Sequence, residues 1–180
     1  MRLIRQLVLA GGALLLAASS FAQSATVAGV KYEEAYDLKG TKLQLNGAGV
    51  RYRGPFKVYT AGMYLGKKAG TPEEAFAVPG AKRISITMLR EIDSGELGKL
   101  FIRGVEDNMD KSAFSKLVPG LMRMSQIFTD VKKLNTGDTF TIDWVPGTGT
   151  VISVKGTQQG DDTAATEIYT ALMRIWLGPN

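Results

Sequence analysis

The stretch of sequence that most restricts the fold is GAGVRYRGPFKVYTAGMYLG, residues 47–66. It predicts a long strand from about Phe56 to Leu65, whose side chains point alternately to two faces. Neither face is purely polar, because large apolar side chains occur in both sets. A strand of this kind has to be covered on both faces, so we expect a sheet that packs against other elements.

The rest of the chain separates strand patterns from helix patterns. Further strands are predicted at 41–45, 82–89, 138–145 and 150–155, with a turn at Asn46–Gly47 after the first of them. Helices are predicted at 71–78, at 93–108, at 112–131 with an interruption at Pro119–Gly120, and from a cap at Asp161–Asp162–Thr163 to Gly178. Without regular βαβ alternation, this order predicts an α+β fold, in which a large antiparallel sheet carries a layer of helices on one face.

The N-terminus is typical of a secretory signal. Arg2 and Arg5 precede an apolar segment at 7–18, and small residues follow at 20–22, where a signal peptidase requires them. About a dozen apolar residues are too few to cross a bilayer, which takes roughly 20. We therefore expect residues 1–22 to be a cleaved signal peptide, 23–30 a loose segment and 31–180 one domain. The mature protein is expected to be periplasmic or secreted, with no stable membrane span.

Charge and composition exclude several classes of function. Removing Arg2 and Arg5 leaves 22 minus 2, or 20, basic residues against 17 acidic ones, a net charge of +3. The basic residues lie in pairs between acidic neighbours and form no stripe, so we expect no nucleic-acid partner. The chain has no cysteine and no histidine, which removes the usual zinc, haem and copper ligands and the base of a Ser-His-Asp triad. We expect no metal and no cofactor.

Two other patterns have ordinary structural interpretations. Asp138 and Asp143 are five residues apart and so point to opposite faces of a strand, which does not suit a catalytic pair. We interpret Asp138 as a turn residue and Asp143 as a solvent-facing residue. Gly47–Ala48–Gly49 lacks the following helix of a dinucleotide-binding fingerprint, so we interpret it as a tight turn.

Arg51 is the most distinctive candidate for a binding residue, because it follows a glycine-rich segment and stands beside a strand rich in tyrosine. Most arginines are surface residues whose stems cover apolar area. The alternative is a guanidinium at the mouth of a pocket, which holds a carboxylate or phenolate through paired hydrogen bonds, with Tyr59 adding a neutral one. Tyr59 could equally be a buried ring tied to the backbone. Arg53, beside the Gly54–Pro55 turn, is expected to be exposed.

Six motifs in this order resemble those of the bacterial chalcone isomerase-like proteins. They are GAGVR at 47–51, FKVY at 56–59 followed by Tyr64–Leu65, the strand at 82–90, NTGD at 135–138, DWVPGTGT at 143–150 and IWLG at 175–178. The resemblance covers nearly the whole mature chain. It implies an open-faced β-sandwich, in which a large antiparallel sheet and a layer of helices enclose a ligand cleft.

The resemblance also implies roles for particular residues. In the plant isomerases an arginine after such a glycine segment polarises the chalcone, and Arg51 matches it. Their strand threonine corresponds to Tyr59 here, and their helix tyrosine and asparagine fall on Leu97 and Gly104, which have no side-chain donor. The fatty-acid-binding branch of the family holds a carboxylate with the arginine and a strand tyrosine, and Arg51 with Tyr59 reproduces that pair.

We therefore expect an exported, non-catalytic binder of a fatty acid or a similar amphipathic carboxylate, or of a phenolic ligand, with Arg51 and Tyr59 as the ligand-binding residues. One alternative is an intramolecular lyase of the chalcone-flavanone isomerase type. A second is a structural or partner-binding periplasmic domain whose cleft is filled by its own side chains.

Overall fold

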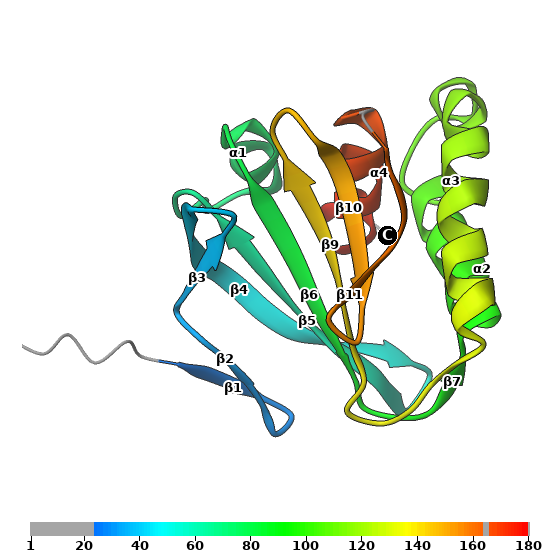
Figure 1. Cartoon of the computed structure of the whole chain (residues 1–180), viewed down its shortest axis with the longest axis horizontal. Coiled ribbons are helices and arrows are strands. Elements are labelled where there is room, and N and C mark those ends of the chain that lie inside the picture. The colour runs from blue at the N-terminus through cyan, green and yellow to red at the C-terminus, as the bar shows by residue number, and fades with distance from the viewer. Residues whose placement is uncertain (1–23, 164–165, 180) are drawn as a thin grey trace, which may run out of the picture.

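A curled antiparallel sheet of seven strands forms the centre of the computed structural model, which describes residues 24–163 and 166–179 (Figure 1). The strands lie in the order β11-β10-β9-β6-β5-β4-β3. Their bounds are β3 Ala35–Leu38, β4 Thr41–Arg53, β5 Phe56–Leu65, β6 Lys82–Met88, β9 Thr139–Val145, β10 Gly149–Val154 and β11 Thr157–Thr163. Two short pairs accompany the sheet, β1 Ala25–Val27 with β2 Val30–Tyr32 and β7 Ile92–Asp93 with β8 Lys133–Leu134.

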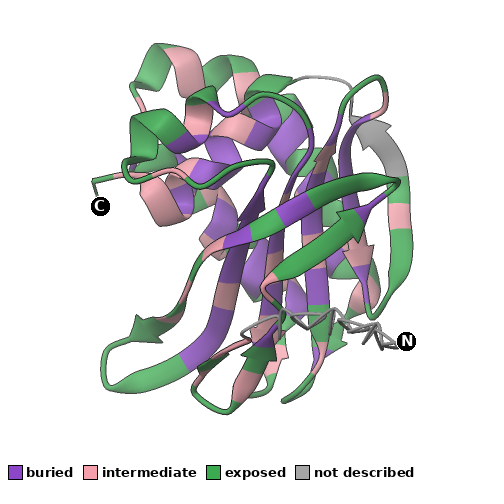
Figure 2. Cartoon of the chain, turned by 90° about the vertical axis from the view of Figure 1, so that its left-hand side faces the viewer, coloured by how far each residue is buried: buried purple, intermediate pink, exposed green. Residues whose placement is uncertain are grey.

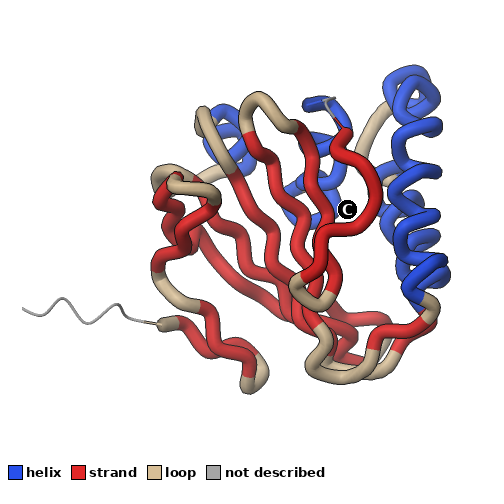
Figure 3. The backbone as a smooth tube through the Cα atoms, in the orientation of Figure 1, coloured by secondary structure: helices blue, strands red, loops and turns tan. Residues whose placement is uncertain are grey.

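Helices cover one face of this sheet, which confirms the predicted α+β architecture (Figure 3). The helices are α1 Pro72–Ala77, α2 Ser94–Glu106, α3 Lys111–Val131 and α4 Thr166–Leu177. We call the face under α2, α3 and α4 the inner face, and the opposite one the outer face. Among the described helices, none combines the length and apolar character that a bilayer span requires.

The main core lies between the inner face and the helices. An aromatic cluster of Phe101, Phe128, Phe140 and Trp176 joins α2, α3, β9 and α4, with ring centroids 5.2 to 5.8 Å apart. Such edge-on and tilted contacts stabilise aromatic pairs beyond the area that they bury. This cluster holds the helix layer against the sheet.

Side-chain caps start α1 and α2 where the sequence predicts them. Thr71 accepts a hydrogen bond from the Glu74 amide at 3.2 Å, and Asp93 accepts one from the Glu96 amide at 3.0 Å. These caps satisfy amide donors that have no partner inside the helix. The predicted interruption at Pro119 is wrong, because α3 continues through it and Gly120 lies directly against Ile168 of α4. Packing between the two helices has overridden the local preference of proline.

A second, smaller core lies on the outer face. Residues 24–30, described above as loose, belong mostly to the β1–β2 hairpin, which crosses this face. The Tyr32 hydroxyl donates to Thr60 Oγ1 at 2.7 Å, and its ring lies over Gly62, where an added Cβ would come within 2.5 Å of the ring. Figure 2 shows buried residues along the strands beneath this hairpin. Both faces of β5 are therefore covered, as its sequence predicts. The predicted signal peptide lies outside the described residues.

Two predicted boundaries differ from the structure. Asn46–Gly47 is not a turn, because β4 continues through it with a β-bulge between Leu45 and Gly47. Gly47–Ala48–Gly49 is accordingly strand rather than tight turn. The segment Asp161–Asp162–Thr163 is not a helix cap, because it continues the edge strand β11, whereas the described part of α4 is Thr166–Leu177. In both places pairing with a neighbouring strand outweighs the local turn or cap signal.

Asp143 is the clearest correction, because it is buried rather than solvent-facing. Its side chain is 4% exposed and accepts two hydrogen bonds from Arg83, at 2.7 Å from Nε and 2.6 Å from Nη2. Arg83 is the cross-strand partner of Asp143 on the outer face, and its guanidinium lies 4.0 Å from the centre of the Tyr36 ring. Asp138, by contrast, is the predicted turn residue, since its carboxylate accepts from the Asn135 amide at 2.8 Å.

Replacing Asp143 by alanine should lower the free energy of unfolding by about 3–5 kcal/mol, because it leaves the Arg83 guanidinium buried without its partner. The double replacement Arg83→Met with Asp143→Leu should be far closer to the wild type, since it buries no charge. Urea unfolding of both variants measures the difference. Equal losses in the single and double variants would show that the loss does not come from an unpaired Arg83.

Candidate ligand-binding site

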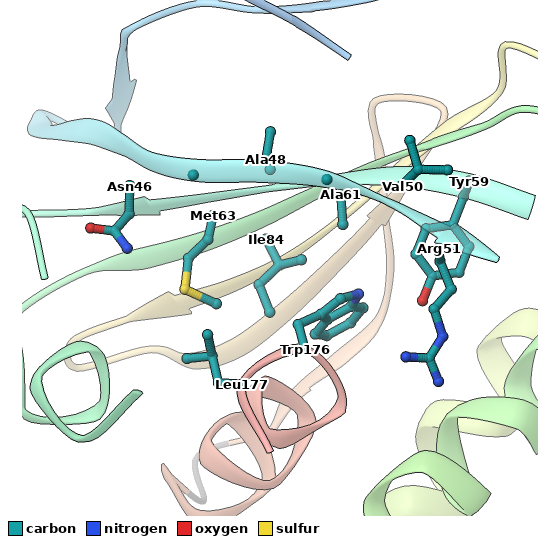
Figure 4. Close-up of a pocket in the computed structure, with 13 residues that line it drawn as sticks. Asn46, Ala48, Val50, Arg51, Tyr59, Ala61, Met63, Ile84, Trp176 and Leu177 are labelled. Atoms are coloured by element: carbon teal, nitrogen blue, oxygen red, sulfur yellow. The ribbon is translucent and has the colours of Figure 1, made fainter. Parts of the chain in front are cut away.

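A cavity of about 330 Å³ lies between the inner face and the C-terminal end of α4 (Figure 4). β4 and β5 form one wall, and Trp176 and Leu177 of α4 form the other. Its lining is mainly apolar, with Met63 and Ile84 below the strands. Most small-molecule sites are clefts of this kind, with an apolar lining and few polar groups.

The cavity exists because small residues face each other across two strands. Gly47 and Gly49 stand on the inner face of β4, and Gly49 pairs with Ala61 on β5. A Cβ added at either glycine would meet no atom within 4 Å. Figure 4 shows the intervening side chains, Ala48 and Val50, pointing away from the cavity. The missing side chains of the two glycines are therefore the space that a ligand would fill.

A β-bulge gives β4 this orientation. Before it, Leu45 pairs with Tyr64 and belongs to the outer core, whereas after it Gly47 pairs with Met63 on the inner face. Because side chains alternate along a strand, one extra residue reverses which set faces inward. The bulged residue, Asn46, is held in place by a hydrogen bond of 2.7 Å from the Ala69 amide to its Oδ1.

Arg51 and Tyr59 come together at one end of the cavity. They are direct cross-strand partners in the β4–β5 ladder, so their side chains share the inner face. Tyr59 is 4% exposed, whereas Arg51 is exposed at the mouth. Figure 4 shows the guanidinium extending past the Tyr59 ring towards the helices. The two predicted site residues are thus brought together, with one buried and one accessible to solvent.

Tyr59 is a neutral hydrogen-bond donor at physiological pH. Burial raises its pKa to about 12, while the positive charge of Arg51 and the indole N–H of Trp176 oppose that rise. An uncharged phenol can donate to a carboxylate, which a phenolate cannot do. The pair therefore offers an anion one charged donor group and one neutral one.

Trp176 is a site residue that the sequence analysis missed. Its ring nitrogen is buried and makes no well-aligned hydrogen bond to any described atom, yet it lies close enough to the Tyr59 hydroxyl to favour the phenolate form. A buried N–H without a partner costs free energy, so a ligand oxygen that accepted from it would bind more tightly. The helical pattern places Trp176 on the apolar face of α4, but no sequence signal shows where its nitrogen points.

A second cavity of about 160 Å³ adjoins the first at Arg51 and Tyr59. It lies between β4, β5 and α2, and its lining includes Arg53, Arg103 and Asp107. Leu97 and Gly104, which the family resemblance matches to the isomerase tyrosine and asparagine, also line it. Leu97 is buried in the core, and Gly104 lets α2 approach Ile175, so neither presents a polar side chain.

Comparison with known proteins shows which family the sequence matches and which solved structure shares this fold. A family model described as chalcone isomerase-like matches residues 24–180. Among solved structures, a fatty-acid binding protein of Arabidopsis thaliana superposes with a TM-score of 0.69 and 16% sequence identity, covering 88% of this chain and 90% of that chain. No curated protein matches the sequence. The similarity in structure establishes the shared fold.

Because the cavity arises where glycines lack side chains, a side chain introduced there should stabilise the fold. Gly49→Val should raise the free energy of unfolding by about 0.5–1 kcal/mol, because glycine is unfavourable inside a strand and the new side chain enters open space. Gly62→Val is the matched control on the adjacent strand. It should lower stability by about 1–3 kcal/mol, because its side chain would displace the Tyr32 ring. Urea unfolding measures both, and a loss in Gly49→Val would mean that the cavity is not open.

Proposed function

The chain belongs to the chalcone isomerase-like family, and on that premise we propose that it is a non-catalytic binder of a fatty acid or a similar amphipathic carboxylate. The observation that carries the proposal is the Arg51–Tyr59 pair at the end of a cavity that is otherwise mainly apolar. The ligand carboxylate would bind at the pair, and its hydrocarbon chain would lie along Gly49, Ala61 and Leu177.

The chemistry of the pair suits a carboxylate. A guanidinium donates two parallel hydrogen bonds to the two oxygens of a carboxylate, and such charge-assisted bonds are stronger than neutral ones. The Tyr59 hydroxyl and the Trp176 N–H would donate hydrogen bonds to the remaining lone pairs of the carboxylate. Tyr59 is buried, so this part of the site is shielded from water and has a low local dielectric constant, which strengthens each of these hydrogen bonds.

The apolar part of the cavity suits a hydrocarbon chain. Its volume, about 330 Å³, is at the lower end of the range for small-molecule sites, roughly 300–1,000 Å³. Burying a methylene group contributes about 0.8 kcal/mol. Affinity should therefore rise with chain length until the chain fills the cavity.

We propose further that the protein acts after export from a bacterial cell, in the periplasm or outside it. The support is the basic, apolar and small-residue pattern of residues 1–22, which is typical of a cleaved signal. Binding a free fatty acid in that compartment requires neither a nucleotide cofactor nor a disulfide bond. Mass spectrometry of the exported protein would reveal whether the chain has lost this segment.

The two alternatives are less well supported by the geometry. An isomerase would use Arg51 to polarise its substrate, but Leu97 and Gly104 present no donor where the plant enzymes have two. A purely structural domain would fill its cleft with its own side chains, whereas here two glycines leave the space open.

Arg51→Ala should weaken the binding of a long-chain fatty acid by roughly 10- to 150-fold, because a hydrogen bond to a charged group contributes about 1.5–3 kcal/mol. Tyr59→Phe and Trp176→Phe should each lose less, about 1 kcal/mol or fivefold, because their donors are neutral. Isothermal titration below the critical micelle concentration measures all three affinities.

Controls separate the site from general charge effects. Arg123→Ala removes an exposed arginine on α3, away from both cavities, and should leave the affinity unchanged. Arg53→Ala tests whether the second cavity, which Arg53 lines, takes part. Gly49→Val blocks the main cavity and should abolish binding of the acyl chain in a folded protein. If Arg51→Ala bound as tightly as the wild type, the arginine would be an ordinary surface residue and the site would be rejected.

The cyclisation of a chalcone should not be faster with the protein than in buffer, because the helix donors of the isomerase site are missing. Absorbance spectroscopy follows the reaction. Turnover at an ordinary enzymatic rate, about 1–1,000 per second, would contradict the proposal of a binder without catalysis. A trace rate that disappears in Arg51→Ala would not, since one guanidinium can still polarise the substrate.

A further inference from the structure

The tip of the β4–β5 hairpin is an exposed, basic and aromatic projection. Its sequence is RYRGPFK, residues 51–57, and every one of these residues is exposed. Tyr52 is 53% exposed and Phe56 is 59% exposed, so two large aromatic side chains stand in solvent. Figure 2 shows this hairpin projecting from the body of the molecule, with its tip coloured as exposed. A single exposed apolar side chain is common on a monomeric protein, but two large rings gathered at one turn form the kind of exposed apolar surface that marks an interaction site.

The tip is well defined in conformation. Only Gly54 and Pro55 connect the strands. Gly54 has a φ of +56°, and the ring of Pro55 fixes the φ angle of Pro55 itself. Arg53 pairs with Phe56 and Tyr52 pairs with Lys57. Cross-strand partners share a face, so each face of the tip carries one aromatic ring and one cation. This arrangement suits insertion of the tip end-on between polar groups, rather than docking by one flat face.

The charge of the tip is entirely positive. Arg51, Arg53 and Lys57 supply three cations and no residue of 51–57 is acidic. The guanidinium of Arg90, in the bend that follows β6, lies 5.0 Å from the centre of the Phe56 ring and adds a fourth cation. Of the neighbouring acids, Glu91 is paired with Lys133 at 2.8 Å, and Asp107 lines the second cavity beside Arg51 and Arg53.

We propose that this tip docks on the surface of a membrane that contains anionic lipids. Tyrosine and other amphipathic rings favour the boundary between headgroups and acyl chains, and phenylalanine inserts its apolar ring there. Basic residues near an anionic lipid surface each strengthen binding about fivefold. The tip combines both features on a rigid turn, so little conformational freedom is lost on docking.

Docking at this place would bring the cavities to the membrane. Arg51 belongs both to the tip and to the site that it forms with Tyr59, so lipid headgroups would lie next to the cavity mouth. The inference rests on the exposed side chains, and it holds whether or not the cavity takes a fatty acid. The shared position gives an amphipathic ligand a short route between bilayer and protein.

Co-sedimentation with vesicles tests the proposal. Residues 24–180, the extent of the family match, are used because the apolar segment at 7–18 would itself bind lipid. The protein should sediment with vesicles of phosphatidylcholine containing phosphatidylglycerol, but far less with phosphatidylcholine alone. Raising the salt concentration should weaken binding, because screening shortens the reach of the charges.

The deciding variant is Phe56→Ser with Lys57→Glu, since neither residue lines a described cavity. It should bind anionic vesicles at least about 25-fold more weakly, because reversing one cation changes the local charge by two. The control is Met122→Ser with Lys42→Glu. This variant has the same change of net charge and removes the Met122 side chain, which is 57% exposed, but both of its substitutions lie away from the tip. It should bind vesicles as the wild type does.

Equal losses in the two double variants would overturn the proposal, because net charge alone would then explain the binding. Equal sedimentation with neutral and anionic vesicles, or none with either, would also overturn it. Fatty-acid titration of the Phe56→Ser, Lys57→Glu variant keeps the two proposals apart. Unchanged acid affinity with lost vesicle binding separates the docking surface from the cavity, whereas failure of the wild type to bind the acid would reject only the proposed function.

Discussion

The β-bulge at Asn46 is the constraint on which the candidate site depends. Upstream of it, Leu43 and Leu45 face the outer core, and downstream of it Gly47, Gly49 and Arg51 face the inner side. The Ala69 amide holds the bulged asparagine, and the Lys68 ammonium donates to the neighbouring Leu45 carbonyl. Without the extra residue the alternation would continue unchanged, so Arg51 would face the outer side and Val50 would enter the cavity. One irregular residue thus decides which side chains a ligand meets.

Much of this fold follows from the sequence, because its strongest signals are local. The strand at 56–65 and the capped starts of α1 and α2 were predictable from alternation and from the residues Thr71 and Asp93. Those signals depend on neighbours within a few positions, which a sequence displays directly. The pairing of Arg51 with Tyr59 came instead from the family resemblance, and the ladder gives its physical basis.

The remainder could not be predicted, because it depends on partners distant in sequence. Asp143 looks like a surface residue until Arg83, 60 positions earlier, is placed opposite it. The bulge at Asn46 looks like a turn until β5 pairs on both sides of it. The sequence pattern places Trp176 among the core residues of α4. Only the packing of α4 brings its indole nitrogen close to Tyr59. In each case a tertiary contact reverses a reasonable local interpretation.

The departures from ordinary strand chemistry are concentrated in one hairpin. A bulge at Asn46, glycines at 47 and 49, and exposed rings at Tyr52 and Phe56 all lie in β4, its turn and the first residue of β5. Each has a cost in stability, since strand glycines are unfavourable and exposed aromatics lose the gain of burial. The β6–β9 and β9–β10 ladders are regular by contrast, with inner-face residues such as Ile84, Ile86 and Ile142 almost fully buried. Proteins keep locally unfavourable features mainly where function needs them. The β4–β5 hairpin is therefore the part of the molecule that stability explains least, as the proposed binding role requires.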